Sequence, residues 1–136
     1  MKLSLGEFVK CLVLLLHRNG VAFSLRSYKP WHLLFYELKK IPETDGKPEF
    51  FKNLRFDWDG PYPECPELSE FLDALCWTGS IVTTSPRFEE YTLPKEMADL
   101  WSQEFEVLGD ETKQFLDTTL ALARNKFRIF CLASTR

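Results

Sequence analysis

Hydrophobic residues recur at helical spacing in several separate stretches of the chain, and this pattern predicts a mostly helical protein. The first stretch predicts a helix over residues 5–18, with Ser4 and Glu7 as a capping box and Asn19-Gly20 as its end. Because this helix is apolar on nearly every side in its middle, we expect it at the centre of the fold.

Four further helices follow from the same periodicity and from start and stop signals along the chain. Their expected starts are near Pro30, near Pro66, just after Pro94 and at Asp110. The second helix carries its own buried stripe and ends before Pro42. His32 falls off that stripe, which predicts a solvated histidine. One helical turn is expected over residues 49–53.

Alternating and β-branched residues predict extended structure in two places. Apolar and polar residues alternate over 54–58, which is the period of a strand with one buried face. Residues 80–84 and 88–93 are rich in β-branched and aromatic side chains around a turn at 85–87, which predicts a β-hairpin. The complete pattern predicts an α+β, mostly helical fold in a single domain spanning residues 1–136.

Charge is distributed unevenly along the 136 residues. Residues 56–117 hold three Lys or Arg against fifteen Asp or Glu, a balance of −12, while residues 1–55 balance at +5 and residues 118–136 at +4. An acidic middle suits a basic partner, or a basic surface on another copy of the chain, because complementary fields steer association.

The arrangement of these elements is similar to that of known regulators. Leu72, Leu75, Gly79 and Ile81 fit the end of a winged-helix third helix, whose glycine opens the wing. The W-D-G-P-Y-P segment, with Gly60-Pro61-Tyr62 at its centre, resembles a block of YwgA-like proteins and of the Panacea (SocA-like antitoxin) group. The resemblance implies a winged-helix-like domain with a short β-hairpin, to which this chain adds extra C-terminal helices without an assigned counterpart. It implies an antitoxin-like regulator that is not an enzyme and has no catalytic residues. We expect no cofactor.

The leading functional hypothesis is therefore a regulatory or protein-interaction domain with an acidic central face. Interfaces favour exposed Tyr and Trp, and acidic side chains suit a basic partner. The competing interpretation of the aromatic residues is that Trp58 lies in the core and Tyr62 covers it. The candidate contact residues are Trp58, Tyr62, Glu64, Glu67, Glu70 and Asp73.

A DNA-binding transcriptional regulator is the alternative, since a winged helix places its third helix in the major groove. Phosphate contacts need several cations, whereas the third helix is acidic on its polar side and the expected wing offers only Arg87. Nucleic acid is possible but disfavoured. Scattered cations on other helices could form a different nucleic-acid face, namely Arg26, Lys29, Lys39, Lys40, Arg124, Lys126 and Arg128.

A haloacid-dehalogenase-like phosphatase is the remote alternative. Asp57-Trp58-Asp59-Gly60 superficially matches the D-x-D-G signature, in which the first Asp attacks phosphorus and the second acts as general acid and base. Pro61 stands where that signature has Thr, and the expected elements do not alternate as a parallel sheet requires.

Cysteine, histidine and hydropathy patterns predict no metal and no membrane span. Cys11, Cys65, Cys76 and Cys131 lie far apart, which suits reduced thiols of a cytoplasmic protein better than a zinc site. The longest apolar run is far shorter than the about 20 residues that a spanning helix needs. We expect a cytoplasmic protein with a protein partner or self-association.

Overall fold

The computed structural model describes residues 3–21, 23, 28–43, 46–77, 82–83 and 91–134, and for 76–77, 82–83, 91–92 and 128–134 it describes the backbone alone. Helices hold 71% of the described residues. The elements are, in chain order, α1 (Leu5–Arg18), α2 (Tyr28–Lys40), the 3₁₀ helix η1 (Glu49–Asn53), α3 (Pro66–Trp77), β1 (Val82–Thr83), β2 (Tyr91–Thr92), α4 (Lys95–Glu106) and α5 (Asp110–Ser134).

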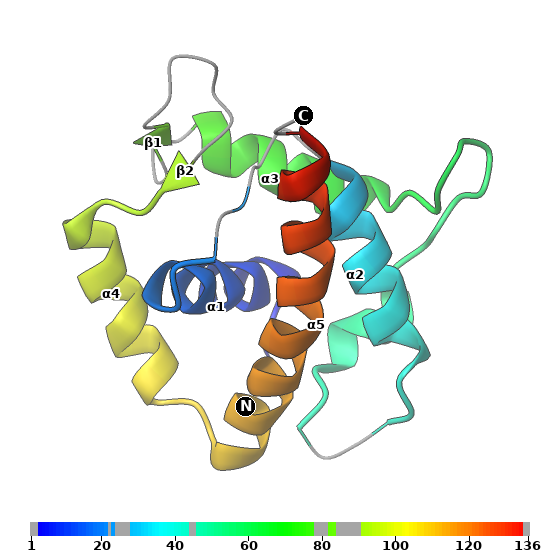
Figure 1. The fold of residues 1–136 in the computed structure, drawn as a ribbon. Helices are drawn as coiled ribbons and strands as arrows, with labels where there is room; N and C mark the ends of the chain where they lie inside the picture. Colours follow the sequence, from blue (N-terminus) through cyan, green and yellow to red (C-terminus); the bar gives the residue numbers. More distant parts are fainter. Residues whose placement is uncertain are drawn as a thin grey trace.

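Helix α1 lies at the centre of the molecule (Figure 1). Its capping box forms as predicted, because the Ser4 hydroxyl accepts from the Glu7 amide and the Glu7 carboxylate accepts from the Ser4 amide, each at 3.2 Å. The helix contacts α4 and α5, and α5 also lies against α2. The predicted central position and bounds of the first helix are confirmed.

The core is organised around Phe8 of α1. Its ring makes edge-on contacts with Phe35 of α2 at 5.8 Å and with Phe50 and Phe51 of η1 at 5.5 and 5.4 Å between ring centroids. It also meets Phe115 of α5 at 6.1 Å. Aromatic rings therefore join three other elements to the central helix.

The α+β winged-helix prediction is wrong, since the described part of the chain is an arrangement of helices. Val82–Thr83 and Tyr91–Thr92 pair antiparallel, but each strand has only two residues and they form no wing. The expected turn at 85–87 lies outside the described residues. A high content of β-branched residues indicates local preference, but a sheet also needs a longer ladder and a face to bury.

The strand predicted over 54–58 is also wrong. These residues are irregular apart from one isolated antiparallel bridge, in which Asp57 and Glu64 exchange backbone hydrogen bonds of 2.8 and 2.9 Å. Pro61 and Pro63 lie inside the loop that the bridge closes and cannot donate to a longer ladder. The alternating pattern here reflects a loop with Leu54 buried and Trp58 exposed.

The remaining helices begin close to their predicted starts. Helix α3 begins at Pro66, α4 follows Pro94, and α5 begins at Asp110, while η1 supplies the expected turn over 49–53. Helix α2 begins at Tyr28, two residues before the predicted Pro30. Within α4, Trp101 and Phe105 are buried, whereas Leu100 is 46% exposed.

Candidate interaction surface

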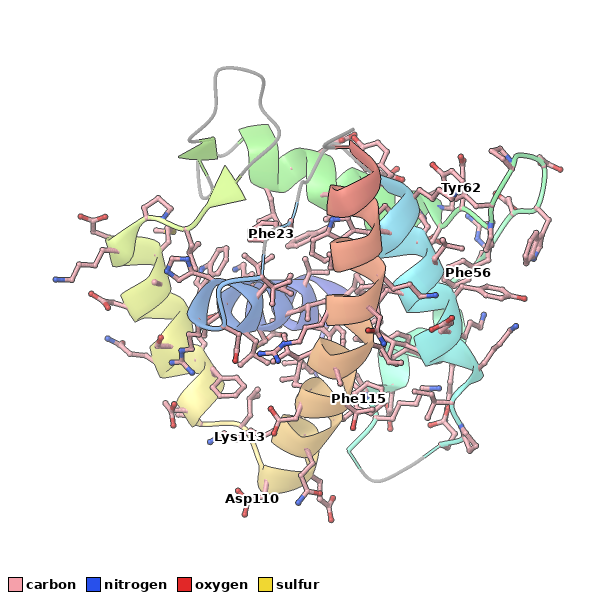
Figure 2. All side chains as sticks on the ribbon, in the orientation of Figure 1. Phe23, Phe56, Tyr62, Asp110, Lys113 and Phe115 are labelled. Atoms are coloured by element: carbon pink, nitrogen blue, oxygen red, sulfur yellow. The ribbon has the colours of Figure 1, made fainter. Side chains whose placement is uncertain are left out.

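A loop that we call the corner, residues 54–64, projects from the fold beside α2 (Figure 1). The Asp57–Glu64 bridge closes it at its base, and the prolines at 61 and 63 restrict its backbone. Figure 2 shows Phe56 and Tyr62 on this loop, on the side of α2 away from α5. The corner is therefore held in one conformation next to α2.

Trp58 is the large aromatic side chain that the corner presents to solvent, with 61% of its surface exposed. Its ring stands edge-on against Tyr36 of α2, with 5.2 Å between centroids and 87° between planes. Tyr36 also contacts Phe56 edge-on at 5.4 Å, and the Lys40 ammonium lies 4.3 Å from the Tyr36 ring centroid. Trp58 thus packs against Tyr36 on one side and is exposed to solvent on the other. The interpretation of Trp58 as a core residue is therefore wrong.

The outer side of α3 continues this surface with negative charge. Glu64, Glu70 and Asp73 are exposed, and Glu67 is half-buried with its carboxylate 3.4 Å from the Arg55 guanidinium. A spacing of three residues turns each carboxylate by about 60° relative to the one before, so Glu67, Glu70 and Asp73 spread over about a third of the circumference of α3. The pKa of Glu67 is lowered, first by its own backbone N–H near the helix start and further by the Cys65 thiol and Arg55.

Beneath the corner lies His32 of α2, which is 1% exposed and hydrogen-bonded through both ring nitrogens. Nδ1 accepts from the Cys65 amide at 2.9 Å, and Nε2 lies 3.0 Å from the Ser69 hydroxyl. The Tyr62 ring lies 5.8 Å from the imidazole and the Tyr28 ring 6.2 Å. The prediction of a solvated histidine is wrong, because α2 buries a second side, facing α3 and the corner, besides its apolar stripe.

The Cys65 amide determines which ring nitrogen of His32 accepts a hydrogen bond and which donates one. An amide N–H can only donate, so Nδ1 is unprotonated, and the proton of the neutral imidazole sits on Nε2 and is donated to Ser69. A serine nucleophile needs the reverse, with its hydroxyl donating to an unprotonated nitrogen. His32 in this arrangement is a structural link between α2 and α3 and does not activate Ser69.

Cys65 is no better placed as a nucleophile. Burial raises the pKa of its thiol to about 11, and the hydrogen bond from Sγ to Glu67 Oε2 (3.3 Å) adds to the effect. Reactive cysteines need the opposite, a lowered pKa and access to solvent. Burial likewise raises the pKa of the Tyr62 phenol, assisted by the Glu64 carboxylate.

The structure brings some predicted residues together and adds others. Trp58, Tyr62 and Glu64 share the corner, while Glu67, Glu70 and Asp73 follow along α3, where Asp73 accepts a hydrogen bond from the Tyr28 hydroxyl. The sequence pattern did not point to Tyr28, Tyr36, Arg55 or Ser69, and it misplaced His32. Tyr28, His32 and Tyr36 recur every fourth residue, so a second helical stripe was the signal that could have found them.

Most of the scattered cations proposed for a nucleic-acid face make contacts within the chain. Lys39 donates to the Leu54 carbonyl, and Lys40 lies over Tyr36. Lys126 pairs with Glu37 at 2.7 Å, and Arg124 donates to Asn19 at 3.0 Å. Lys29 is exposed, and the side chains of Arg26, Arg87 and Arg128 lie outside the described residues.

The D-x-D-G motif lies in the corner, with Asp57 and Asp59 both exposed. A phosphatase of the haloacid-dehalogenase type holds these aspartates at the end of a parallel strand, whereas the strand pairing in the described ranges is antiparallel. This arrangement does not support that alternative.

The described residues contain no group of three or more His, Cys, Asp or Glu side chains placed to hold a metal ion. Within the same residues, every helix is too short or too polar to cross a bilayer.

Compared with known proteins, the chain matches no family model, no curated protein and no solved structure. The resemblance to YwgA-like and SocA-like proteins therefore stays a prediction, and the winged-helix fold that it implied is contradicted.

Proposed function

We propose that this chain is a non-catalytic protein-interaction domain that binds a basic segment of a partner protein through the corner and the acidic side of α3. One observation carries the proposal: Trp58 is 61% exposed on a loop closed by two backbone hydrogen bonds. Large aromatic side chains dominate binding energy at interfaces, and a preformed loop loses little conformational entropy on binding.

The charge around Trp58 favours a basic partner. Asp57, Asp59 and Glu64 are exposed on the same loop, and Glu70 and Asp73 continue the negative surface along α3. An arginine of the partner could stack on the indole while neighbouring cations meet these carboxylates. DNA phosphates would face the same carboxylates and be repelled, so protein is the better-supported partner. The scattered cysteines keep the cytoplasm as the expected compartment.

Selection of short random peptides on the immobilised parent protein, followed by measurement of their affinity for Trp58→Ala, tests the proposal. We expect the selected peptides to be rich in Arg or Lys and to bind Trp58→Ala at least about 30-fold more weakly, as loss of an interface tryptophan costs about 2 kcal/mol or more. Val107→Ala is the matched control, because Val107 is 72% exposed on the α4–α5 connection and should leave binding unchanged.

Three outcomes would contradict the proposal. Selected peptides without excess positive charge would contradict a basic partner. Peptides that bind Trp58→Ala as tightly as the parent protein would contradict binding through the corner. Sedimentation showing a dimer that Trp58→Ala dissociates would assign the surface to a second copy of the chain instead.

A further inference from the structure

The imidazole of His32 holds the junction between the corner and α3 to α2, whereas Tyr36 and Lys39 hold the corner itself. Cys65 directly follows the corner, and its carbonyl accepts the first backbone hydrogen bonds of α3, from Leu68 at 3.1 Å and Ser69 at 3.2 Å. Its amide donates to His32 Nδ1 at 2.9 Å. The Ser69 hydroxyl, one turn further along α3, accepts a hydrogen bond from Nε2–H. One side chain of α2 thus fixes the start of α3 at two points.

We infer that His32 is a pH-sensitive latch, whose protonation releases the start of α3, and the end of the corner that joins it, from α2. Trp58 lies on the corner and Glu70 and Asp73 lie on α3, so movement at the Cys65 junction changes how the two parts of the candidate surface lie relative to one another. The regulatory part of the inference rests on the docking surface proposed above, whereas the latch itself does not.

Protonation is incompatible with the observed geometry for a simple reason. It places a hydrogen on Nδ1, directly opposite the Cys65 N–H, so two donors would face each other across 2.9 Å. The imidazolium could keep its bond to Ser69 but not the bond to Cys65. An amide that loses a buried acceptor carries a desolvation penalty, which favours opening of the contact.

The groups around His32 decide the direction of the pH effect. Burial lowers the pKa of His32, and the Glu64 carboxylate opposes this by favouring the charged ring. Three other titratable groups near His32 carry no charge: the Tyr62 and Tyr28 phenols and the buried Cys65 thiol. The two remaining carboxylates contact other partners, since Glu67 accepts from Cys65 and pairs with Arg55, and Asp73 accepts from Tyr28. Burial is the larger effect, so the closed latch prefers a neutral ring.

The sign of the dependence follows from this preference. An exposed histidine has a pKa of about 6.5, and the opened latch takes up a proton that the closed latch resists. Above that pH the opening constant of the latch is at its lowest and independent of pH. Below it the constant grows as the pH falls, approaching tenfold per pH unit until the closed form also binds a proton. At about pH 5.5 opening should be about tenfold more frequent than at about pH 7.5.

Amide hydrogen exchange at Cys65, corrected for the intrinsic effect of pH, measures this opening. We expect protection at Cys65 to fall about tenfold between about pH 7.5 and pH 5.5. His32→Gln, whose amide can replace both hydrogen bonds but does not titrate, should show no such fall. The chain has only one other histidine, the exposed His17, so His17→Gln is the matched control and should behave as the parent does.

A second measurement needs no variant. Nitrogen-15 spectra of the imidazole should show the Nε2–H tautomer at neutral pH, and the Cys65 amide shift should change with the same midpoint as the His32 ring. An Nδ1–H tautomer, unchanged Cys65 protection, or pH dependence that persists in His32→Gln and disappears in His17→Gln would overturn the latch. Binding of the selected basic peptide should weaken over the same pH range. If no peptide binds at any pH, the proposed function fails while Cys65 exchange still decides the latch.

Discussion

At the scale of single residues, buried polar contacts fix parts of this fold that hydrophobic patterning does not reveal. Lys47 is 6% exposed, and its ammonium donates to the carbonyls of Lys39 (3.0 Å) and Ile41, at the end of α2. These carbonyls belong to the helix end, where intrahelical donors run out. Burial lowers the pKa of Lys47, but its ammonium and the two carbonyls satisfy one another's hydrogen-bonding capacity. A lysine in a polar loop is expected to be solvated, so the sequence alone does not show that Lys47 caps α2.

Gly46 illustrates a second contact of this kind, and it supports a prediction. A Cβ atom at this position would lie 2.1 Å from the Glu111 carbonyl oxygen in the first turn of α5, and backbone cannot rotate aside as a side chain can. We expect Gly46→Ala to lower the free energy of unfolding by about 1–3 kcal/mol, as overpacking does elsewhere. Urea denaturation measures it, with Gly109→Ala as control, because nothing lies within 4 Å of its added carbon. Equal stability of the two variants would contradict the close approach.

At the scale of elements, helix ends and buried stripes were predictable, whereas contacts between elements were not. The bounds of α1 followed from local signals, its capping box and Asn19-Gly20, which act over a few residues. The place of His32 depends on which element covers its side of α2, and a single stripe of apolar residues does not specify that. The expected strand over 54–58 failed for the same reason, since a strand exists only if another strand pairs with it.

The capping box of α1 gives a prediction at this scale. Ser4→Ala removes the acceptor for the Glu7 amide, and we expect a loss of about 1 kcal/mol in the free energy of unfolding. Glu7→Gln keeps an acceptor for the Ser4 amide and should cost less. Chemical denaturation of both variants checks the order, and a larger loss in Glu7→Gln would show that charge at the helix start matters more than the box.

At the scale of the whole molecule, one aromatic cluster joins elements that are distant in the chain. Phe8 contacts rings of α2, η1 and α5, so its removal leaves a cavity bordered by all three elements. We expect Phe8→Ala to destabilise the protein by about 3–5 kcal/mol, and Val107→Ala, 72% exposed, by no more than about 0.5 kcal/mol. Thermal unfolding followed by circular dichroism compares them, and a Phe8→Ala protein as stable as the parent would contradict a shared core.

Charge at the same scale agrees with the position of the candidate surface. The segment with a balance of −12, residues 56–117, begins in the corner and runs through α3 and α4 into the start of α5. Cations of α2 and α5 make internal contacts, such as the Lys126–Glu37 pair at 2.7 Å. The acidic character was therefore predictable by counting, but the exposure of Trp58 on a closed loop was not, because it depends on Tyr36 from another element.

The most direct test of the central claim is an NMR titration of the nitrogen-15-labelled protein with the tightest basic peptide from the selection. If the corner is the docking surface, the largest amide shift changes fall in residues 57–64 and along the outer side of α3, and the Trp58 indole N–H shifts as well. A peptide of the same length with Arg and Lys replaced by Glu should leave these signals unchanged. Shift changes centred instead on α4 around Leu100, or on the cations of α2 and α5, would contradict the claim that the corner is the docking surface.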